Sequence, residues 1–171
     1  YWFRKIVFSN LFQKLFLISD NFKRKLIFFC IYKSNHWRKY KNPLVNESIS
    51  GLGSDIKITK KLVTDLNNFI KSNNIKSILD LGCGDFNWMK NIIKNNHELY
   101  YLGIEIVQDI VNANNRLYSS SKIKFKCADI LIDKIEYNYD LIIIRDLFIH
   151  IKIKDVIDIL KNIQLSGCKF Y

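Results

Sequence analysis

From Ile58 onward, short apolar runs alternate with stretches whose apolar residues recur every three or four positions. The runs predict strands at Ser77 to Leu81, Tyr100 to Ile106, Ile123 to Cys127 and Leu141 to Ile144. The other stretches predict helices at Ile58 to Ile70, Asn87 to Asn95, Gln108 to Tyr118 and Lys154 to Ile163. Strands that alternate with helices of this length form crossover units and a parallel sheet. The sequence therefore predicts an α/β fold.

The first 41 residues differ in composition from the rest of the chain. They hold ten basic residues and one acid, whereas residues 42–171 hold seventeen basic and fifteen acidic residues. They also hold half of the aromatic residues, and their apolar positions predict one or two helices with a break at Ser19 to Asn21. We therefore divide the chain into a basic aromatic arm, residues 1–41, and a domain, residues 42–171.

Two functions suit the arm. Packing against another part of a longer protein is the favoured interpretation, and weak contact with an anionic membrane or polymer is the alternative. Because the charge and the aromatic residues stop before the α/β pattern begins, we expect deletion of residues 1–30 to leave ligand binding to the domain intact.

The cysteines and the apolar runs set bounds on the environment of the chain. The scattered Cys30, Cys83, Cys127 and Cys168 form no C-x-x-C pair and have no histidine at zinc-site spacing, so we expect free thiols and no metal. The sequence contains no uncharged apolar run of about 18 residues and no signal-peptide pattern. We expect a cytoplasmic protein without a transmembrane segment. Since the chain begins at Tyr1 and stops in mid-pattern at CKFY, we also expect it to be part of a longer protein.

Two glycines, Gly82 and Gly84, follow the first predicted strand. Ligands of parallel sheets bind beyond the carboxyl ends of the strands, and glycines there let backbone N–H groups approach a ligand. The start of the next helix favours a negative group. This loop suits a dinucleotide pyrophosphate and an amino-acid carboxylate equally well.

Acids near the ends of the first three strands separate these two ligands. Asp80 ends the first strand region, Glu105 can accept both hydroxyls of a ribose, and Asp129 can accept a hydrogen bond from an adenine amino group. A dinucleotide fingerprint requires a third glycine where Asn87 stands. The pattern therefore favours S-adenosylmethionine, while helix capping and loop bracing are the structural alternatives for the three acids.

Four segments carry a family resemblance: SILDLGCGDFNWM, YLGIEIVQDIV, FKCADI and YDLIIIRDLFIHI. They resemble the successive motifs of class I S-adenosylmethionine-dependent methyltransferases, and CGDFNWM with RD-x-x-x-H resembles a bacterial-type branch of that family. The resemblance covers about residues 31–171 and implies a Rossmann-like three-layer sandwich with strand order three, two, one, four. A fifth strand would lie beside the fourth. Since it has barely started at Lys169 to Tyr171, we expect Leu141 to Ile144 to form a largely unpaired edge.

The resemblance also implies which residues bind the cofactor S-adenosyl-L-methionine. These residues are Asp80, Gly82, Gly84, Asp85, Glu105, Asp129 and Ile130. Glu105 would hold the ribose, Asp129 and the backbone of Ile130 the adenine, and the glycine loop the methionine part. Phe86 stands where the broader superfamily often has a third glycine, so the loop must follow another path, with Phe86 or Trp88 covering the cofactor.

Arg145, Asp146 and His150 follow the fourth strand, where a methyl acceptor should enter. The four-residue spacing of Asp146 and His150 allows them to share a helical face, with the acid orienting a catalytic imidazole. In the alternative without a catalytic role, Asp146 caps a turn and His150 packs under a helix. We expect a methyltransferase with an unknown acceptor, and keep a nicotinamide-dependent oxidoreductase and a binding protein acting through the arm as alternatives.

Overall fold

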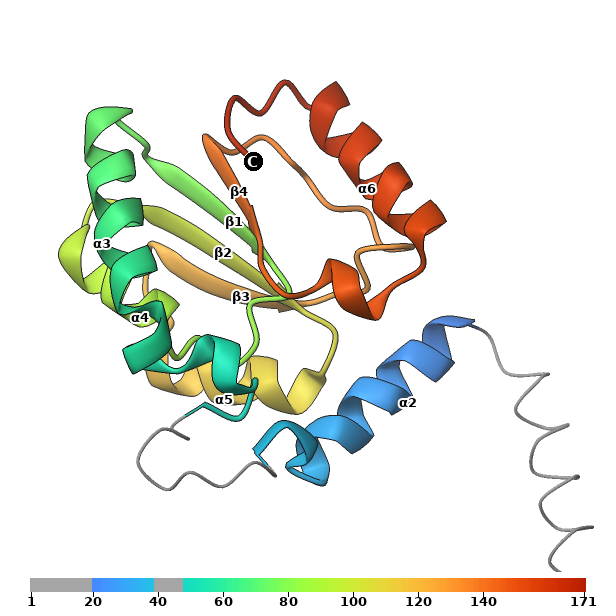
Figure 1. The fold of residues 1–171 in the computed structure, drawn as a ribbon. Helices are drawn as coiled ribbons and strands as arrows, with labels where there is room; N and C mark the ends of the chain where they lie inside the picture. The colour runs from blue at the N-terminus through green and yellow to red at the C-terminus, as the bar shows by residue number, and fades with distance from the viewer. Residues whose placement is uncertain (1–19, 39–47) are drawn as a thin grey trace, which may run out of the picture.

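Four parallel strands form the centre of the protein (Figure 1). The structure is a computed structural model that describes residues 20–38 and 48–171. The strands are β1 (Ser77–Leu81), β2 (Tyr100–Glu105), β3 (Ile123–Cys127) and β4 (Leu141–Ile144). They lie in the order β3-β2-β1-β4. The predicted parallel sheet and the strand order implied by the family resemblance are confirmed, and the strands lie where they were predicted, with β2 ending one residue earlier than expected.

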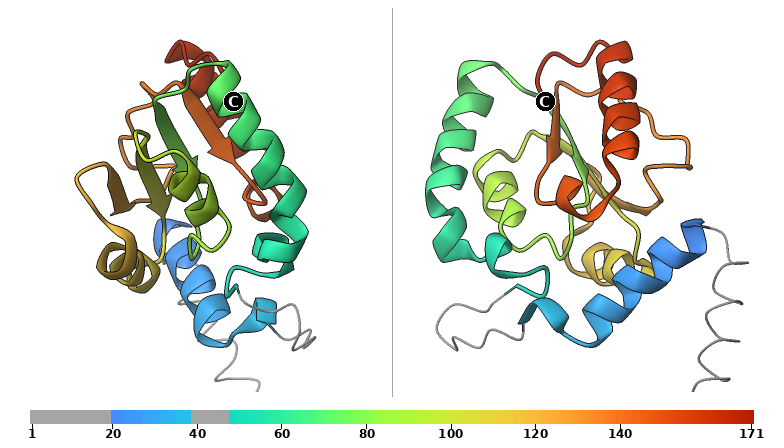
Figure 2. Two further views of the ribbon diagram at one scale, coloured as in Figure 1. Left: turned by 90° about the vertical axis from the view of Figure 1, so that its left-hand side faces the viewer. Right: turned by 45° about the vertical axis from the view of Figure 1, so that its right-hand side comes forward.

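Helices cover both faces of the sheet (Figures 1 and 2). On one face lie α3 (Ile56–Ser72), α4 (Met89–Asn95) and α5 (Gln108–Tyr118), and on the other lies α6 (Ile153–Leu165). The short 3₁₀ helices are η1 (His36–Arg38), η2 (Leu52–Ser54) and η3 (Phe148–His150). This arrangement is the predicted three-layer α/β fold.

Alternation along the strands divides the core into two layers. Ile78 and Tyr101 pack toward α3, α4 and α5, whereas Leu79, Leu81 and Ile104 pack toward α6. Successive side chains of a strand point to opposite faces, so an apolar run of this kind is buried on both sides. The sheet is thereby fixed between two apolar layers, and only its strand ends are free to build a site.

The outer edge of β4 carries little pairing in the described part of the chain. One isolated parallel bridge joins Leu141 to Phe170, and the Ile142 N–H donates to the Phe170 carbonyl over 3.0 Å. This agrees with the expected position of a fifth strand beside the fourth.

The described part of the arm forms α2 (Asp20–Lys33), which lies across the carboxyl ends of the strands (Figures 1 and 2). The predicted break at Ser19 to Asn21 falls at the limit of the described residues, and the predictions for residues 1–19 and 39–47 lie outside them. Contacts of α2 with Asp129, Ser50 and His150 show that it is not independent of the domain. The predicted boundary at residue 41 therefore separates segments that the fold brings together. No helix in the described ranges is long and apolar enough to cross a membrane.

Candidate functional site

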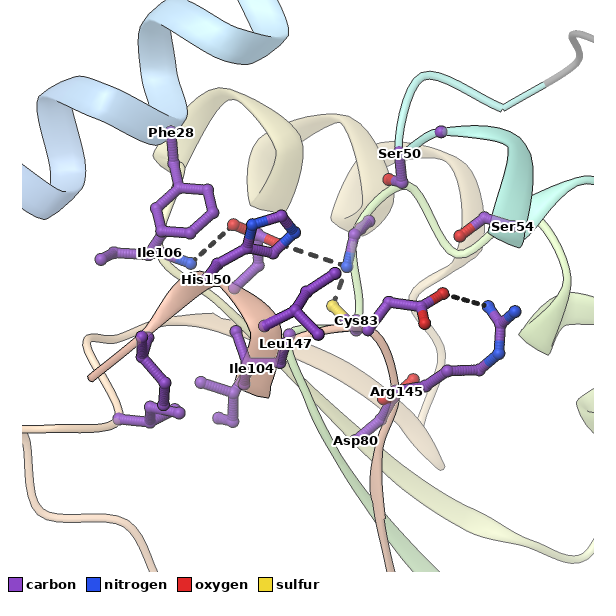
Figure 3. Close-up of a pocket in the computed structure, with 18 of the residues that line it drawn as sticks. Phe28, Ser50, Ser54, Asp80, Cys83, Ile104, Ile106, Arg145, Leu147 and His150 are labelled. Atoms are coloured by element: carbon purple, nitrogen blue, oxygen red, sulfur yellow. Dashed lines mark hydrogen bonds and ion pairs between the residues drawn. The ribbon is translucent and has the colours of Figure 1, made fainter. Parts of the chain in front are cut away.

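A cavity of about 260 Å³ lies at the carboxyl ends of the four strands (Figure 3). Its walls come from the loops that follow β1, β2, β3 and β4, from the segment before α3, and from α2. Parallel sheets place their ligand sites at this edge, as the sequence analysis expected. Six of the seven predicted cofactor residues and both predicted catalytic residues line it: Asp80, Gly82, Gly84, Glu105, Asp129, Ile130, Asp146 and His150.

The glycine loop turns sharply after β1. Gly82 and Gly84 have φ angles of 79° and 56°, in the left-handed region that glycine adopts without steric cost. The N–H groups of Gly82 and Cys83 donate to the Ile104 carbonyl over 2.9 and 3.0 Å. A Cβ atom on Gly84 would collide with the side chain of Ser50. Glycine at position 84 therefore lets the loop pack against the segment that precedes α3.

Phe86 keeps the backbone conformation of a glycine. Its φ is 59°, and its ring is 2% exposed, packed against Tyr101, Tyr118 and Phe125 with ring centroids 5.0 to 5.1 Å apart. A left-handed residue other than glycine costs about 1–2 kcal/mol, which burial of a phenylalanine offsets. Phe86 thus belongs to the core and does not cover the cavity. Because the loop continues through Phe86, α4 begins at Met89 instead of the predicted Asn87.

The Glu105 side chain joins the end of β2 to the glycine loop by a hydrogen bond. Its Oε2 accepts the Gly84 N–H over 3.2 Å, and its Oε1 accepts the N–H groups of Ile106 and Val107 over 2.8 and 3.1 Å. Burial raises the pKa of this carboxyl, and the three backbone donors act in the opposite direction. The carboxylate is therefore fixed in orientation at the cavity wall.

Asp80 is a second buried carboxyl on the cavity wall. Its Oδ2 accepts the Tyr101 hydroxyl over 2.7 Å. Burial raises its pKa to about 7, with a further rise from Glu105, while Tyr101 and Arg145 lower it. Asp80 consequently changes charge near neutral pH, and a cationic ligand group beside it would favour the ionised form.

Asp129 is paired with the arm. Arg24 of α2 donates to its Oδ2 from Nε over 2.9 Å and from Nη2 over 2.7 Å. The Asp129 Oδ1 accepts the Leu131 N–H over 3.1 Å. The aspartate side chain is 1% exposed and that of Arg24 is 22% exposed. A contact between an arginine of the arm and this carboxylate was not predicted from the sequence.

Asp85 is the one predicted cofactor residue that does not line the cavity. Both of its carboxylate oxygens accept the Ser48 hydroxyl, at 2.9 and 3.0 Å, and its Oδ2 accepts the Ile49 N–H over 2.7 Å. The Asp85 N–H in turn donates to the Ser50 hydroxyl over 2.9 Å. Asp85 braces the segment before α3, and a direct role in cofactor binding stays a prediction.

The predicted helical pairing of Asp146 with His150 is wrong. Asp146 has a φ of 57°, which ends regular structure after β4, and its carboxylate pairs with Arg145 over 3.2 Å. His150 lies at the end of η3, and no hydrogen bond joins it to Asp146, both residues being described. Its ring instead contacts that of Phe28, with centroids 5.9 Å apart (Figure 3), and that of Trp37, with centroids 5.5 Å apart. A left-handed residue interrupts the helix that the four-residue spacing assumed.

Several residues of the cavity wall were missed by sequence reasoning. Arg24, Phe28, Tyr32 and Trp37 come from the arm and its η1 extension. Their only signal was the unusual concentration of aromatic and basic residues there, which does not say where the arm packs. Trp88 is 5% exposed in the wall, and the Arg145 guanidinium lies 5.5 Å from the centre of its ring.

The remaining chemistry of the described residues is limited. All four cysteines are free thiols, and burial raises the pKa of Cys83 well above its ordinary value, so this thiol stays protonated. No cluster of metal-ligating side chains occurs in residues 20–38 and 48–171. The site thus consists of buried carboxyls, two arginines, backbone donors and aromatic rings.

Residues 79–166, just over half of the chain, match the family model of a methyltransferase domain. The chain belongs to this methyltransferase family. The match runs from β1 to the end of α6 and so includes the glycine loop and the ends of all four strands. No curated protein matches the chain.

Solved structures resemble the fold of this methyltransferase domain. The plantazolicin methyltransferase BpumL, in complex with a pentazolic desmethylPZN analog and SAH, is 20% identical, with a TM-score of 0.56 over 78% of this chain and 47% of that one. The methyltransferase domain of bacterial CtHen1-C is 17% identical, with a TM-score of 0.54 over 63% and 60% of the two chains.

A third structure, an S-adenosylmethionine-dependent methyltransferase from Clostridium acetobutylicum ATCC 824, is 23% identical, with a TM-score of 0.52 over 65% and 48% of the chains. The present chain spans between 47% and 60% of these three proteins. At such identities the likeness shows a shared fold, which agrees with the observed order of strands.

Proposed function

We propose that this methyltransferase domain binds S-adenosylmethionine in the cavity and transfers its methyl group to an acceptor still to be identified. One observation carries the proposal. The buried carboxyls Asp80, Glu105 and Asp129, from the ends of three successive strands, face one cavity beside a glycine loop. This set of acceptors matches a ligand that has an ammonium group, a ribose and an amino-purine.

Each part of the cofactor has a complementary residue in the cavity wall. Glu105 would accept the ribose hydroxyls, and Asp129 with the backbone of Ile130 would bind the adenine. Asp80 would bind the methionine ammonium beside the glycine loop. Arg145, whose side chain is 25% exposed, adds a cation for the methionine carboxylate that the sequence analysis did not assign. These residues therefore fit the cofactor.

When bound, S-adenosylmethionine supplies an electrophilic methyl group whose departure needs no acid. The task of the protein is then to hold the acceptor in line with the methyl group and to exclude water, and orientation of this kind contributes about 7–11 kcal/mol. Phe28, Trp37 and His150 surround the mouth of the cavity and would enclose the acceptor. His150 would also accept a proton where the acceptor must lose one.

Asp146 keeps its proposed place on the acceptor side, now with a different partner. Its pairing with Arg145 fixes the position of the guanidinium over Trp88. Gly53 approaches both side chains so closely that an added Cβ would meet the Asp146 carboxylate. We infer that Asp146 positions Arg145 and the segment before α3.

Titration with S-adenosylhomocysteine and with NADH tests this function. We expect calorimetry to show binding of S-adenosylhomocysteine and no binding of NADH. Asn87 occupies the position of the third glycine of a dinucleotide fingerprint, and its side-chain amide donates a hydrogen bond to the Ser54 carbonyl over 3.1 Å. Asp80→Asn should weaken the binding. Preference for NADH would instead support the oxidoreductase, and binding of neither would reject the proposed function.

A further inference from the structure

Arg24 blocks access to the carboxylate of Asp129, to which the adenine should bind. Its two donors approach the Oδ2 of Asp129, the Leu131 N–H takes Oδ1, and the aspartate side chain is only 1% exposed. A ligand atom therefore reaches this carboxylate only if Arg24 moves away. The cavity of about 260 Å³ is also smaller than the roughly 300–1,000 Å³ typical of small-molecule sites.

A buried carboxylate cannot lose its partner without receiving another. Removing one member of a buried ion pair leaves an uncompensated charge, which is strongly unfavourable. We propose that Arg24 and the adenine amino group exchange as partners of Asp129, so that α2 is a lid whose latch opens when the nucleoside enters. This inference rests on the proposed function. It adds that access to the cofactor site is controlled by one residue of the arm.

The other contacts of α2 suit a helix that moves. None of its fourteen residues is fully buried. Its contacts with the domain include the Tyr32 hydroxyl, 3.2 Å from the Ser50 hydroxyl, and the Phe28 ring against His150. Lys33 adds an ion pair with Asp109 that is more than half exposed on both sides and is screened by salt.

The latch also connects the two ends of the cavity. Arg24 and Phe28 are four residues apart on α2 and so lie on one helix face, one turn from each other. Arg24 contacts Asp129, to which the adenine should bind. Phe28 contacts His150, on the side where the acceptor should enter (Figure 3). Release of Arg24 should therefore also loosen the contact of Phe28 with His150.

Calorimetric titration of S-adenosylhomocysteine into three proteins tests the latch: the unsubstituted chain, Arg24→Ala and the control Lys33→Ala. We expect Arg24→Ala to bind at least about five-fold more tightly, the lower end of typical coupling between competing contacts. Lys33→Ala removes an ion pair of the same helix outside the cavity and should bind like the unsubstituted chain. Equal or weaker binding by Arg24→Ala overturns the proposal. Arg24→Lys, which keeps a cation but loses the two-nitrogen contact, should give a smaller increase and serves if Arg24→Ala does not fold.

A second measurement separates failure of the latch from failure of the proposed function. Chemical unfolding of Arg24→Ala, Asp129→Asn and the double variant gives the coupling between the two side chains without any cofactor. We expect the double variant to lose less stability than the two single losses added together. Additive losses overturn the latch and leave the proposed function standing. Clear coupling, with no binding of S-adenosylhomocysteine by any variant, rejects the proposed function and the exchange with it.

Discussion

The two sides of the cavity are held together by different kinds of contact. On the strand side, backbone N–H groups bind Glu105, and the Tyr101 hydroxyl binds Asp80. On the helix side, α2 is joined to the domain by side chains, such as Arg24 to Asp129 and Tyr32 to Ser50. The first set joins neighbouring strands of the sheet and their loops, whereas the second joins a separate helix to the domain, over 18 residues for Tyr32 with Ser50 and 105 residues for Arg24 with Asp129.

This difference separates the roles of the two sides. Contacts with backbone N–H groups of a tight loop cannot be exchanged unless the loop itself unfolds, since each buried donor must keep a partner. Side-chain contacts of a helix without fully buried residues can be replaced one at a time. The strand side therefore fixes stability and ligand position, while the helix side controls access.

The largest expected effect concerns the strand side. Phe86→Ala should lower the free energy of unfolding by about 3–5 kcal/mol, because it empties a space enclosed by three other rings. Phe86→Gly loses one further methyl group but removes the strain of the 59° φ, so we expect it to be no less stable than Phe86→Ala. Urea unfolding of both variants checks this. A glycine variant clearly less stable than the alanine variant would show that the left-handed backbone stores little strain.

The second prediction uses the charge of Asp80. The folded state holds its proton up to about pH 7, whereas the unfolded state loses it near the ordinary value of 3.8. The stability that this proton contributes is present below about pH 4 and is lost as the pH rises to 7. Relative to Asp80→Asn, the unsubstituted chain should lose up to about 4 kcal/mol across this window. Unfolding of both proteins at pH 4.5, 6 and 8 measures the difference, and a constant difference would contradict the raised pKa.

The strand side was also the predictable side. Apolar runs placed β1, β3 and β4 with their observed bounds, and strand ends placed the acids around one cavity, because both follow from local periodicity and parallel topology. The local sequence does not predict the left-handed backbone conformation of Phe86. Burial of its ring against Tyr101, Tyr118 and Phe125, which come from β2, α5 and β3, offsets the cost of that conformation. The pairing of Asp146 with His150 failed because Asp146 adopts a φ of 57°, which a four-residue spacing does not reveal.

The position of α2 was not predictable, for a related reason. Its aromatic and basic residues identify an unusual segment but contain no periodicity that selects one docking surface. The contact of Arg24 with Asp129 spans 105 residues and depends on a carboxylate that becomes buried only in the folded domain. Deletion of residues 1–30 would remove Arg24 and Phe28 from the cavity wall. That cofactor binding survives this deletion stays a prediction, and the latch adds that loss of Arg24 frees Asp129 for the ligand.

The third prediction tests whether Glu105 acts on the ligand as well as on the loop. Glu105→Ala should weaken binding of S-adenosylhomocysteine by about 1.5–3 kcal/mol, the scale of a charged hydrogen-bonding partner. Glu105→Gln keeps one acceptor oxygen, which can still serve the N–H groups of Ile106 and Val107, and should lose less. Calorimetry gives both affinities, and unfolding curves show whether each variant is folded. Unchanged affinity of a folded Glu105→Ala would remove Glu105 from the ligand site and leave it a purely structural role.

The smallest expected effect concerns the helix side. Tyr32→Phe removes the hydroxyl that lies 3.2 Å from the Ser50 hydroxyl while keeping the ring against Trp37, so it should cost about 0.5–1.5 kcal/mol of stability. Lys33→Ala is the matched control on the next residue, and its exposed pair with Asp109 should contribute at most about 1 kcal/mol, falling with added salt. Urea unfolding at low and high ionic strength measures both. A loss for Tyr32→Phe as large as that for Phe86→Ala would mean that α2 is part of the core. In that case the two sides of the cavity would be equally fixed, and the helix could not serve as a lid.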